Sequence, residues 1–169
     1  MMVDARLCAR NLVAQHHAGG AAPVPVERIA KALGIVIEYG AFGEELSGLA
    51  YIRDGVSMIG VNSLHAPTRQ RFTIAHELGH ICLHGEELRK AVHVDKGSLR
   101  RDPVSSTGSD PLEVQANAFA SEFLMPEPLL EAALAGKPVD LEDEKVVAAL
   151  AKKFRVSETA MRYRLQLKD

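Results

Sequence analysis

Apolar residues recur at helical spacing from Val3 to Val13, and Gly19 ends the pattern. The sequence therefore predicts an amphipathic helix in this part of the chain. A second, shorter helix is expected from Val26 to Leu33, because Gly34 suits the left-handed conformation that closes many helices. The run from Ile35 to Tyr39 is rich in β-branched and aromatic residues and predicts a strand.

The pattern then changes to that of a β-hairpin followed by a long helix. Leu49 to Arg53 and Val56 to Val61 flank Asp54-Gly55, a dipeptide that tolerates positive φ and favours a two-residue turn. Pro67 suits the first position of a helix, and apolar residues at helical spacing continue from it to Leu83. This helix carries the residues with the clearest chemistry.

The second half of the chain is expected to be mainly helical. Gly85 to Ser109 is polar and rich in turn-forming residues, so we expect a loop there, with a short strand at Ala91 to Val94. Asp110-Pro111 suits a helix N-cap and first helical position, and Met125-Pro126 ends that helix. Two short helices follow in the segment Val146 to Leu167. This order of elements predicts an α+β domain in which helices surround a small antiparallel sheet.

The composition is that of a globular protein with one ordinary domain. The chain has 169 residues, of which 47% are hydrophobic and 25% charged, enough to bury a sizeable core. A formal charge of -2 excludes a surface that binds polyanions over its whole extent. Cys8 and Cys82 offer no disulfide framework. The sequence has no signal-peptide pattern and no apolar run of roughly 20 residues, so we expect a cytoplasmic protein.

A candidate metal-binding motif lies in the helix that begins at Pro67. His76 and His80 are four residues apart, so on a helix they share one face, with roughly 6 Å of rise between them, and can reach one ion. Glu77 projects beside them, where a zinc peptidase needs a base that takes a proton from water. Two histidines at this spacing also arise by coincidence on amphipathic helices. The apolar residues around the motif favour a metal site, because a charged glutamate on a half-buried helix needs a partner.

A zinc site of this kind needs a third ligand from another element. His84 continues the spacing of four, but it lies about 12 Å from His76 along a straight helix and is expected to have a structural role. Glu113 is the best candidate, with Asn117 one turn later on the same side of its helix. Glu113 also has the position of a capping-box residue, which would bond the amide of Asp110 instead. Three residues remain as weaker alternatives: His93, Asp102 and Glu122.

Two longer stretches around these residues resemble one family. The first is RQRFTIAHELGH at residues 69–80, and the second is EVQANAFA at residues 113–120, followed by FLMP at residues 123–126. Over residues 25–126 the chain resembles the ImmA/IrrE family of metallopeptidases, and Arg101-Asp102 with Ser105-Ser106 adds to the likeness. Gln115 stands where many members have glutamate, a difference that leaves the proposed ligands unchanged.

The resemblance implies a zincin-like fold in which His76, His80 and Glu113 bind zinc and Glu77 is the catalytic base. It also implies a zinc-dependent endopeptidase whose protein substrate is a helix-turn-helix transcriptional repressor, cleaved to relieve repression during stress. Residues 1–139 would form the zincin-like metallopeptidase domain. We further expect a strand of the hairpin to bind extended substrate by edge pairing. Three residues stay open as donors to the reaction's oxyanion: Tyr51, His65 and His93.

Residues 140–169 have the pattern of a helix-turn-helix, with two helices joined at Arg155-Val156-Ser157. A DNA-binding role would need several basic residues of this segment to face phosphates together. These are Lys152, Lys153, Arg155, Arg162, Arg164 and Lys168. We favour packing of the two helices on the peptidase domain. The alternatives to the peptidase are a regulator that binds metal without turnover and a regulator that binds DNA directly.

Overall fold

The computed structural model describes residues 3–96 and 110–168. The helices in these ranges are α1 (Ala5–His16), α2 (Val26–Ala32), α3 (Pro67–Leu83), α4 (Gly85–Lys90), α5 (Pro111–Leu124), α6 (Glu127–Leu134), α7 (Glu144–Phe154) and α8 (Glu158–Gln166). The strands are β1 (Val36–Gly40), β2 (Gly48–Arg53), β3 (Val56–Asn62) and β4 (His93–Asp95). The chain is therefore an α+β protein, as expected. None of these helices combines the length and the apolar character that crossing a membrane requires.

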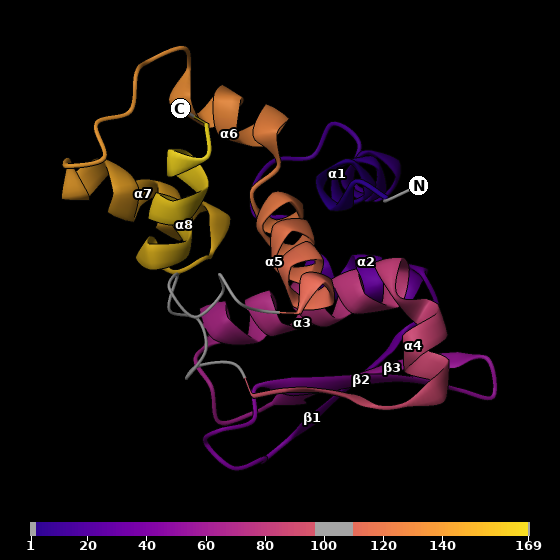
Figure 1. Ribbon diagram of the computed structural model, residues 1–169. Coiled ribbons are helices and arrows are strands. Elements are labelled where there is room, and N and C mark those ends of the chain that lie inside the picture. The colour runs from indigo at the N-terminus through magenta and orange to yellow at the C-terminus, as the bar shows by residue number, and fades with distance from the viewer. Residues whose placement is uncertain (1–2, 97–109, 169) are drawn as a thin grey trace.

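The helices lie over one side of the sheet, with α3 next to the strands and α5 beyond α3 (Figure 1). The strand order is β1-β3-β2-β4. β2 and β3 form the expected hairpin, in which Arg53 pairs with Val56 and both turn residues have positive φ, 51° at Asp54 and 77° at Gly55. These values match the turn that the Asp-Gly dipeptide favours.

The sheet is mixed, so the expectation of an antiparallel sheet is wrong for β1. β1 pairs with β3 in parallel, with Val36 opposite Met58. The local sequence indicates a strand here but not its neighbour, which the chain reaches only after it has formed β2. The hairpin strands also occupy the two inner positions, and β1 and β4 are the edges of the described sheet. The expectation that the hairpin supplies the free edge is therefore wrong.

Two helices lie where none was expected. α4 occupies the start of the segment that we expected to be a loop, and α6 begins directly after Pro126. Two glutamates lie in the first turn of α4, and Arg89 and Lys90 lie in its last turn. These charges stabilise α4, because acidic groups interact favourably with the N-terminal end of the helix dipole and basic groups with the C-terminal end. Leu88 is buried and anchors the helix.

α3 forms the centre of the molecule, between the sheet and α5. Every residue from Thr73 to His80 is buried. Gly48 lets β2 lie close to this helix: a Cβ there would be 2.4 Å from Cγ2 of Thr73 and 2.8 Å from the carbonyl oxygen of Gly60. A side chain at position 48 would clash with the Thr73 side chain of α3 and with the backbone of β3.

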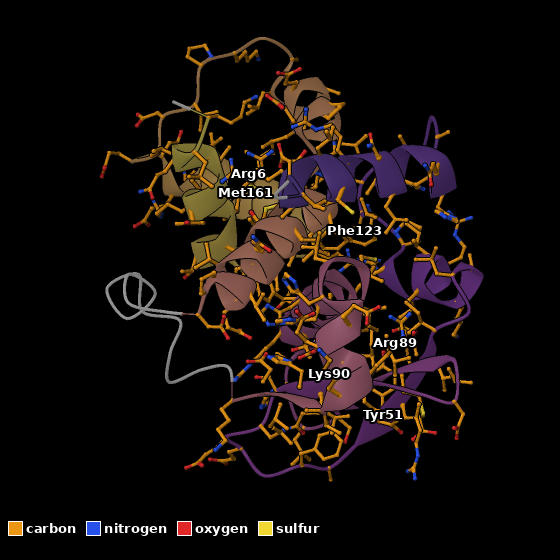
Figure 2. All side chains as sticks on the ribbon, turned by 45° about the vertical axis from the view of Figure 1, so that its right-hand side comes forward. Arg6, Tyr51, Arg89, Lys90, Phe123 and Met161 are labelled. Atoms are coloured by element: carbon orange, nitrogen blue, oxygen red, sulfur yellow. The ribbon has the colours of Figure 1, made fainter. Side chains whose placement is uncertain are left out.

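The C-terminal helices α7 and α8 share the hydrophobic core of the preceding helices. Phe154 and Met161 are fully buried in the same cluster as Phe123 of α5. Figure 2 shows Met161 and Phe123 on the helical side of the molecule, whereas Tyr51 lies on the sheet. Ser157 caps α8, because its hydroxyl oxygen accepts a hydrogen bond from the amide of Ala160 at 3.1 Å.

A buried ion pair links α8 to α5. Glu122 and Arg164 have side-chain exposures of 2% and 6%, and their Oε2 and Nη2 atoms are 2.7 Å apart. Arg10 of α1 contacts the other oxygen of Glu122 at 3.1 Å. Glu122, a weaker candidate for the third metal ligand, therefore pairs with arginines. Two other basic residues of the segment also make internal contacts, Arg162 with the carbonyl oxygen of Leu141 and Lys168 with Glu131.

Replacing Glu122 by glutamine is expected to lower the free energy of unfolding by about 3–5 kcal/mol, because it leaves the Arg164 charge buried without its partner. Urea unfolding of the purified chain measures this change. Glu127→Gln is the matched control. Glu127 pairs with Arg10 at 2.7 Å, but both side chains are about 40% exposed, so its loss should cost at most about 1 kcal/mol. Equal effects of the two variants would show that burial does not set the strength of the pair.

Candidate metal centre

Four side chains from three elements meet between α3, α5 and β4. His76 and His80 come from α3, His93 from β4 and Glu113 from α5. One ligand-capable atom of each lies within 4.8 Å of the others. The structure therefore brings together the three residues that the sequence indicated as ligands, and adds His93.

The Nε2 atoms of His76 and His80 lie 3.2 Å apart, as expected for histidines one helical turn apart. Both face the carboxylate of Glu113: Nε2 of His76 is 3.3 Å from Oε2, and Nε2 of His80 is 3.0 Å from Oε1. The Glu113 side chain thus points at the histidines. The side-chain cap of α5 comes from Asp110, whose Oδ1 accepts a hydrogen bond from the amide of Leu112 at 2.9 Å.

Asn117 orients the first histidine. Its Oδ1 lies 3.0 Å from Nδ1 of His76, and an amide oxygen only accepts hydrogen bonds. Nδ1 of His76 therefore carries a hydrogen, and Nε2 is the nitrogen that faces His80 and Glu113. Such a hydrogen bond to the far ring nitrogen commonly holds a metal-binding histidine in place.

The centre favours a bound cation. Two imidazole nitrogens and a carboxylate face one another at 3.0–3.3 Å, and their lone pairs and negative charge repel unless a positive charge lies among them. The ligands of a tetrahedral zinc ion, with bonds of about 2.0–2.1 Å, are themselves about 3.3 Å apart. Imidazole nitrogen and carboxylate oxygen are also zinc ligands. The residues His76, His80 and Glu113 therefore fit a zinc ion.

The pKa shifts of these side chains also reflect the close approach of acidic and basic groups. Burial raises the pKa of Glu113, but hydrogen bonds from the three histidines outweigh burial and hold that pKa well below its usual range. Burial lowers the pKa of His93, yet its contacts with Glu113 and Glu77 prevail and raise it to about 10. Burial lowers the pKa of His80. A metal ion that binds these side chains competes with protons for them, so its binding should release protons.

Glu77 is fully buried beside this cluster. Its Oε2 lies 3.0 Å from Nδ1 of His93, and its Oε1 has no hydrogen-bond partner among the described residues. A buried carboxylate oxygen that makes no hydrogen bond costs stability. Folding alone therefore does not explain why Glu77 is buried at this position.

A cavity of about 160 Å³ lies next to the cluster, lined by residues that include His80, His93 and Glu113. His84 also lines it. The His84 side chain is buried, and its ring centroid is 5.6 Å from that of His80, but it is not one of the four clustered residues. Asp102, another candidate ligand, lies outside the described residues.

Of the three candidate oxyanion donors, the structure brings His93 to the centre. Tyr51 instead donates its hydroxyl hydrogen to Sδ of Met58 at 2.8 Å. The ring of His65 contacts the side chain of Asn62 at 3.3 Å.

Sequence reasoning missed Asp95 and gave His93 too little weight. Asp95 is buried on β4, and one of its oxygens lies within 4.8 Å of ligand-capable atoms of His76 and Glu77. Residues 93 and 95 share one face of β4, because side chains alternate along a strand. The alternation of polar and apolar residues in His93-Val94-Asp95 was the available signal.

Gly79 lets α5 lie directly against α3. A Cβ there would be 3.1 Å from Cδ1 and 3.2 Å from Cβ of Phe119, which is fully buried. We expect overpacking in Gly79→Ala to cost about 1–3 kcal/mol. The roughly 1 kcal/mol that alanine gains in helix propensity offsets part of this cost, so the chain should lose up to about 2 kcal/mol of stability. Zinc affinity should also fall, because the shift moves Glu113 relative to the histidines.

Urea unfolding and zinc titration measure both effects of Gly79→Ala. Gly85→Ala is the control, since a Cβ there would be 3.7 Å from its nearest neighbour, an ordinary contact. Unchanged or increased stability of Gly79→Ala would show that α5 does not need this close approach.

The chain resembles known peptidases in sequence. Residues 30–166 match the peptidase M78 family, described as the IrrE N-terminal-like domain. The radiation response metalloprotease IrrE of Deinococcus radiodurans is 34% identical over 120 residues, which cover 67% of this chain and 33% of that protein. The chain thus spans about a third of the length of this relative.

The fold also resembles a solved structure, that of a Mycobacterium tuberculosis transcriptional regulator. The TM-score is 0.57 at 15% sequence identity, and the match covers 94% of this chain and 45% of the other. At this identity the match concerns the fold alone.

Proposed function

The chain belongs to the IrrE N-terminal-like family of peptidases, and from this premise we propose that it is a zinc-dependent endopeptidase. In this proposal His76, His80 and Glu113 hold the zinc, within a zincin-like fold. The observation that supports it most strongly is the short distance between these groups: the Nε2 atoms of His76 and His80 lie 3.2 Å apart, and each is 3.0–3.3 Å from a carboxylate oxygen of Glu113.

Glu77 is the general base of the proposed reaction. The chemistry that a bound zinc ion supplies is Lewis acidity, which polarises the substrate carbonyl and makes water acidic enough to lose a proton near neutral pH. Glu77 takes that proton through Oε1, which has no hydrogen-bond partner in the described part of the chain, and delivers it to the leaving amine.

The proposed substrate is a helix-turn-helix transcriptional repressor. Family membership supports this substrate class, and the relative in Deinococcus radiodurans is named for its part in the radiation response. The substrate would lie as an extended segment along β4, because β4 is an edge strand of the described sheet and His93 places it at the metal centre. Direct DNA binding gains less support, since Arg162, Arg164 and Lys168 make contacts within the chain.

Incubation of the zinc-loaded chain with helix-turn-helix repressors encoded next to its gene tests the proposal. Mass spectrometry should find two fragments that together account for one repressor, and none after the zinc has been removed with a chelator. If every such repressor stays intact while the chain holds zinc, the repressor-cleaving proposal fails, and a regulator that binds metal without turnover becomes the better interpretation.

A further inference from the structure

His93 lies between the two carboxylates of the metal centre. β4 fixes its backbone, since Ala50 and His93 are paired residues of β2 and β4. Its ring lies against that of His80, with the centroids 3.8 Å apart and the planes inclined by 30°. The His93 side chain is 21% exposed, so protein atoms hold most of it in place.

Each ring nitrogen of His93 faces a different glutamate. Nδ1 is 3.0 Å from Oε2 of Glu77, and Nε2 is 2.6 Å from Oε1 of Glu113. An ionised carboxylate only accepts hydrogen bonds, so both nitrogens donate. One ring therefore ties the proposed base on α3 to the proposed ligand on α5.

The distance to Glu113 marks a hydrogen bond rather than shared coordination. Two ligands of a tetrahedral zinc ion with bonds of about 2.0–2.1 Å lie about 3.3 Å apart. The 2.6 Å between Nε2 of His93 and Oε1 of Glu113 is well below that spacing and within the range of a charge-assisted hydrogen bond.

Both carboxylates need such an anchor. The Glu113 side chain is 32% exposed and comes from the first turn of α5, so the bond to His93 further restricts its rotamers. One oxygen of Glu77 is bonded to His93. The other has no hydrogen-bond partner within residues 3–96 and 110–168, which leaves it for proton transfer. Hydrogen bonds of this kind tune metal sites, and their loss typically costs 10–100-fold in affinity or activity.

We propose that His93 is a positioning residue with two separable tasks, holding Glu113 for zinc through Nε2 and holding Glu77 for proton transfer through Nδ1. This inference rests on the proposed peptidase function. It adds a residue from β4 to a centre otherwise built from α3 and α5.

Two substitutions separate the tasks, because an asparagine amide nitrogen takes the place of Nδ1 and a glutamine amide nitrogen that of Nε2. His93→Asn keeps the bond to Glu77 and should weaken zinc binding by about 10-fold or more, a larger loss than it causes in kcat of the zinc-saturated chain. His93→Gln keeps the bond to Glu113 and should bind zinc normally, while kcat falls by about 10-fold or more at constant KM. His93→Ala should show both losses.

Three measurements are needed. Competition with a chelating dye gives the zinc affinity, and the absorption spectrum of the cobalt-substituted chain reports the ligands. Kinetics on a cleaved repressor give kcat and KM. Thermal unfolding checks that each variant folds. His16→Gln on α1 is the matched control and should behave as the wild type.

Normal zinc affinity in His93→Asn together with normal kcat in His93→Gln would overturn the inference. It would also be overturned if every variant changed the cobalt spectrum as the loss of a nitrogen ligand does, since His93 would then bind the metal itself. The affinity measurements need no turnover. If the wild type cleaves nothing, but zinc binding weakens in His93→Asn and not in His93→Gln, the proposed function fails and the role of His93 at Glu113 stands.

Discussion

Replacing Glu77 by glutamine is expected to lower kcat for repressor cleavage by about 10²–10⁴-fold while the bound zinc stays in place. Glutamine has nearly the same size and keeps an oxygen for His93, but it cannot take a proton from water. The zinc-binding side chains proposed here are His76, His80 and Glu113, so the substitution leaves all three intact. Kinetics on the purified chain, with zinc per chain measured by mass spectrometry, test both halves of the prediction.

Glu86→Gln provides the control for this substitution, because Glu86 is a 76% exposed residue that pairs with Arg89 on α4. Its kcat should equal that of the wild type. If Glu77→Gln cleaved as fast as the wild type, Glu77 would not be the base. If the variant lost cleavage in vitro but still relieved repression in cells, a binding regulator would explain the biology better than a peptidase.

Replacing Glu113 by alanine is expected to weaken zinc binding by more than about 100-fold, because loss of an outer-shell hydrogen bond alone already costs 10–100-fold. A ligand that binds only the folded state stabilises it by about 2.7 kcal/mol at 100 times its dissociation constant. The wild type should therefore gain thermal stability from zinc, and Glu113→Ala should gain little. Zinc titration followed by thermal unfolding measures this difference.

Two further variants separate a metal ligand from a helix cap at this position. Glu113→Gln keeps the ability to accept a hydrogen bond from a cap amide but loses the carboxylate charge, so it should bind zinc poorly. Asp110→Ala removes the observed cap of α5 and should cost about 1 kcal/mol of stability with zinc affinity nearly unchanged. Normal zinc binding by Glu113→Gln would contradict the assignment of Glu113 as a ligand.

Local sequence signals predicted the elements that carry the centre. The helix from Pro67 and the helix capped by Asp110 follow from N-terminal residues and apolar periodicity, and the hairpin follows from Asp54-Gly55. The spacing of His76 and His80 placed both on one face of one helix. These features depend on residues within one or two turns of each other, so sequence alone was enough to predict them.

Features that depend on distant contacts were harder to predict. Glu113 was the best candidate ligand but also fitted a capping box, and only the packing of α5 on α3 shows its carboxylate turned toward the histidines. The parallel pairing of β1 depends on where β3 arrives, and the role of His93 depends on β4 pairing with β2. The choice between Glu122 and Glu113 likewise required the position of Arg164, which comes from the far end of the chain.

Metal analysis of the full chain, purified without chelator and then titrated with zinc, tests most directly whether His76, His80 and Glu113 hold one ion. We expect about one zinc per chain, released by a strong chelator and restored on titration, with protons released as the metal binds. A chain that carries no divalent metal after purification, and takes up none at any zinc concentration that leaves it folded, would contradict the proposed centre and the peptidase built on it.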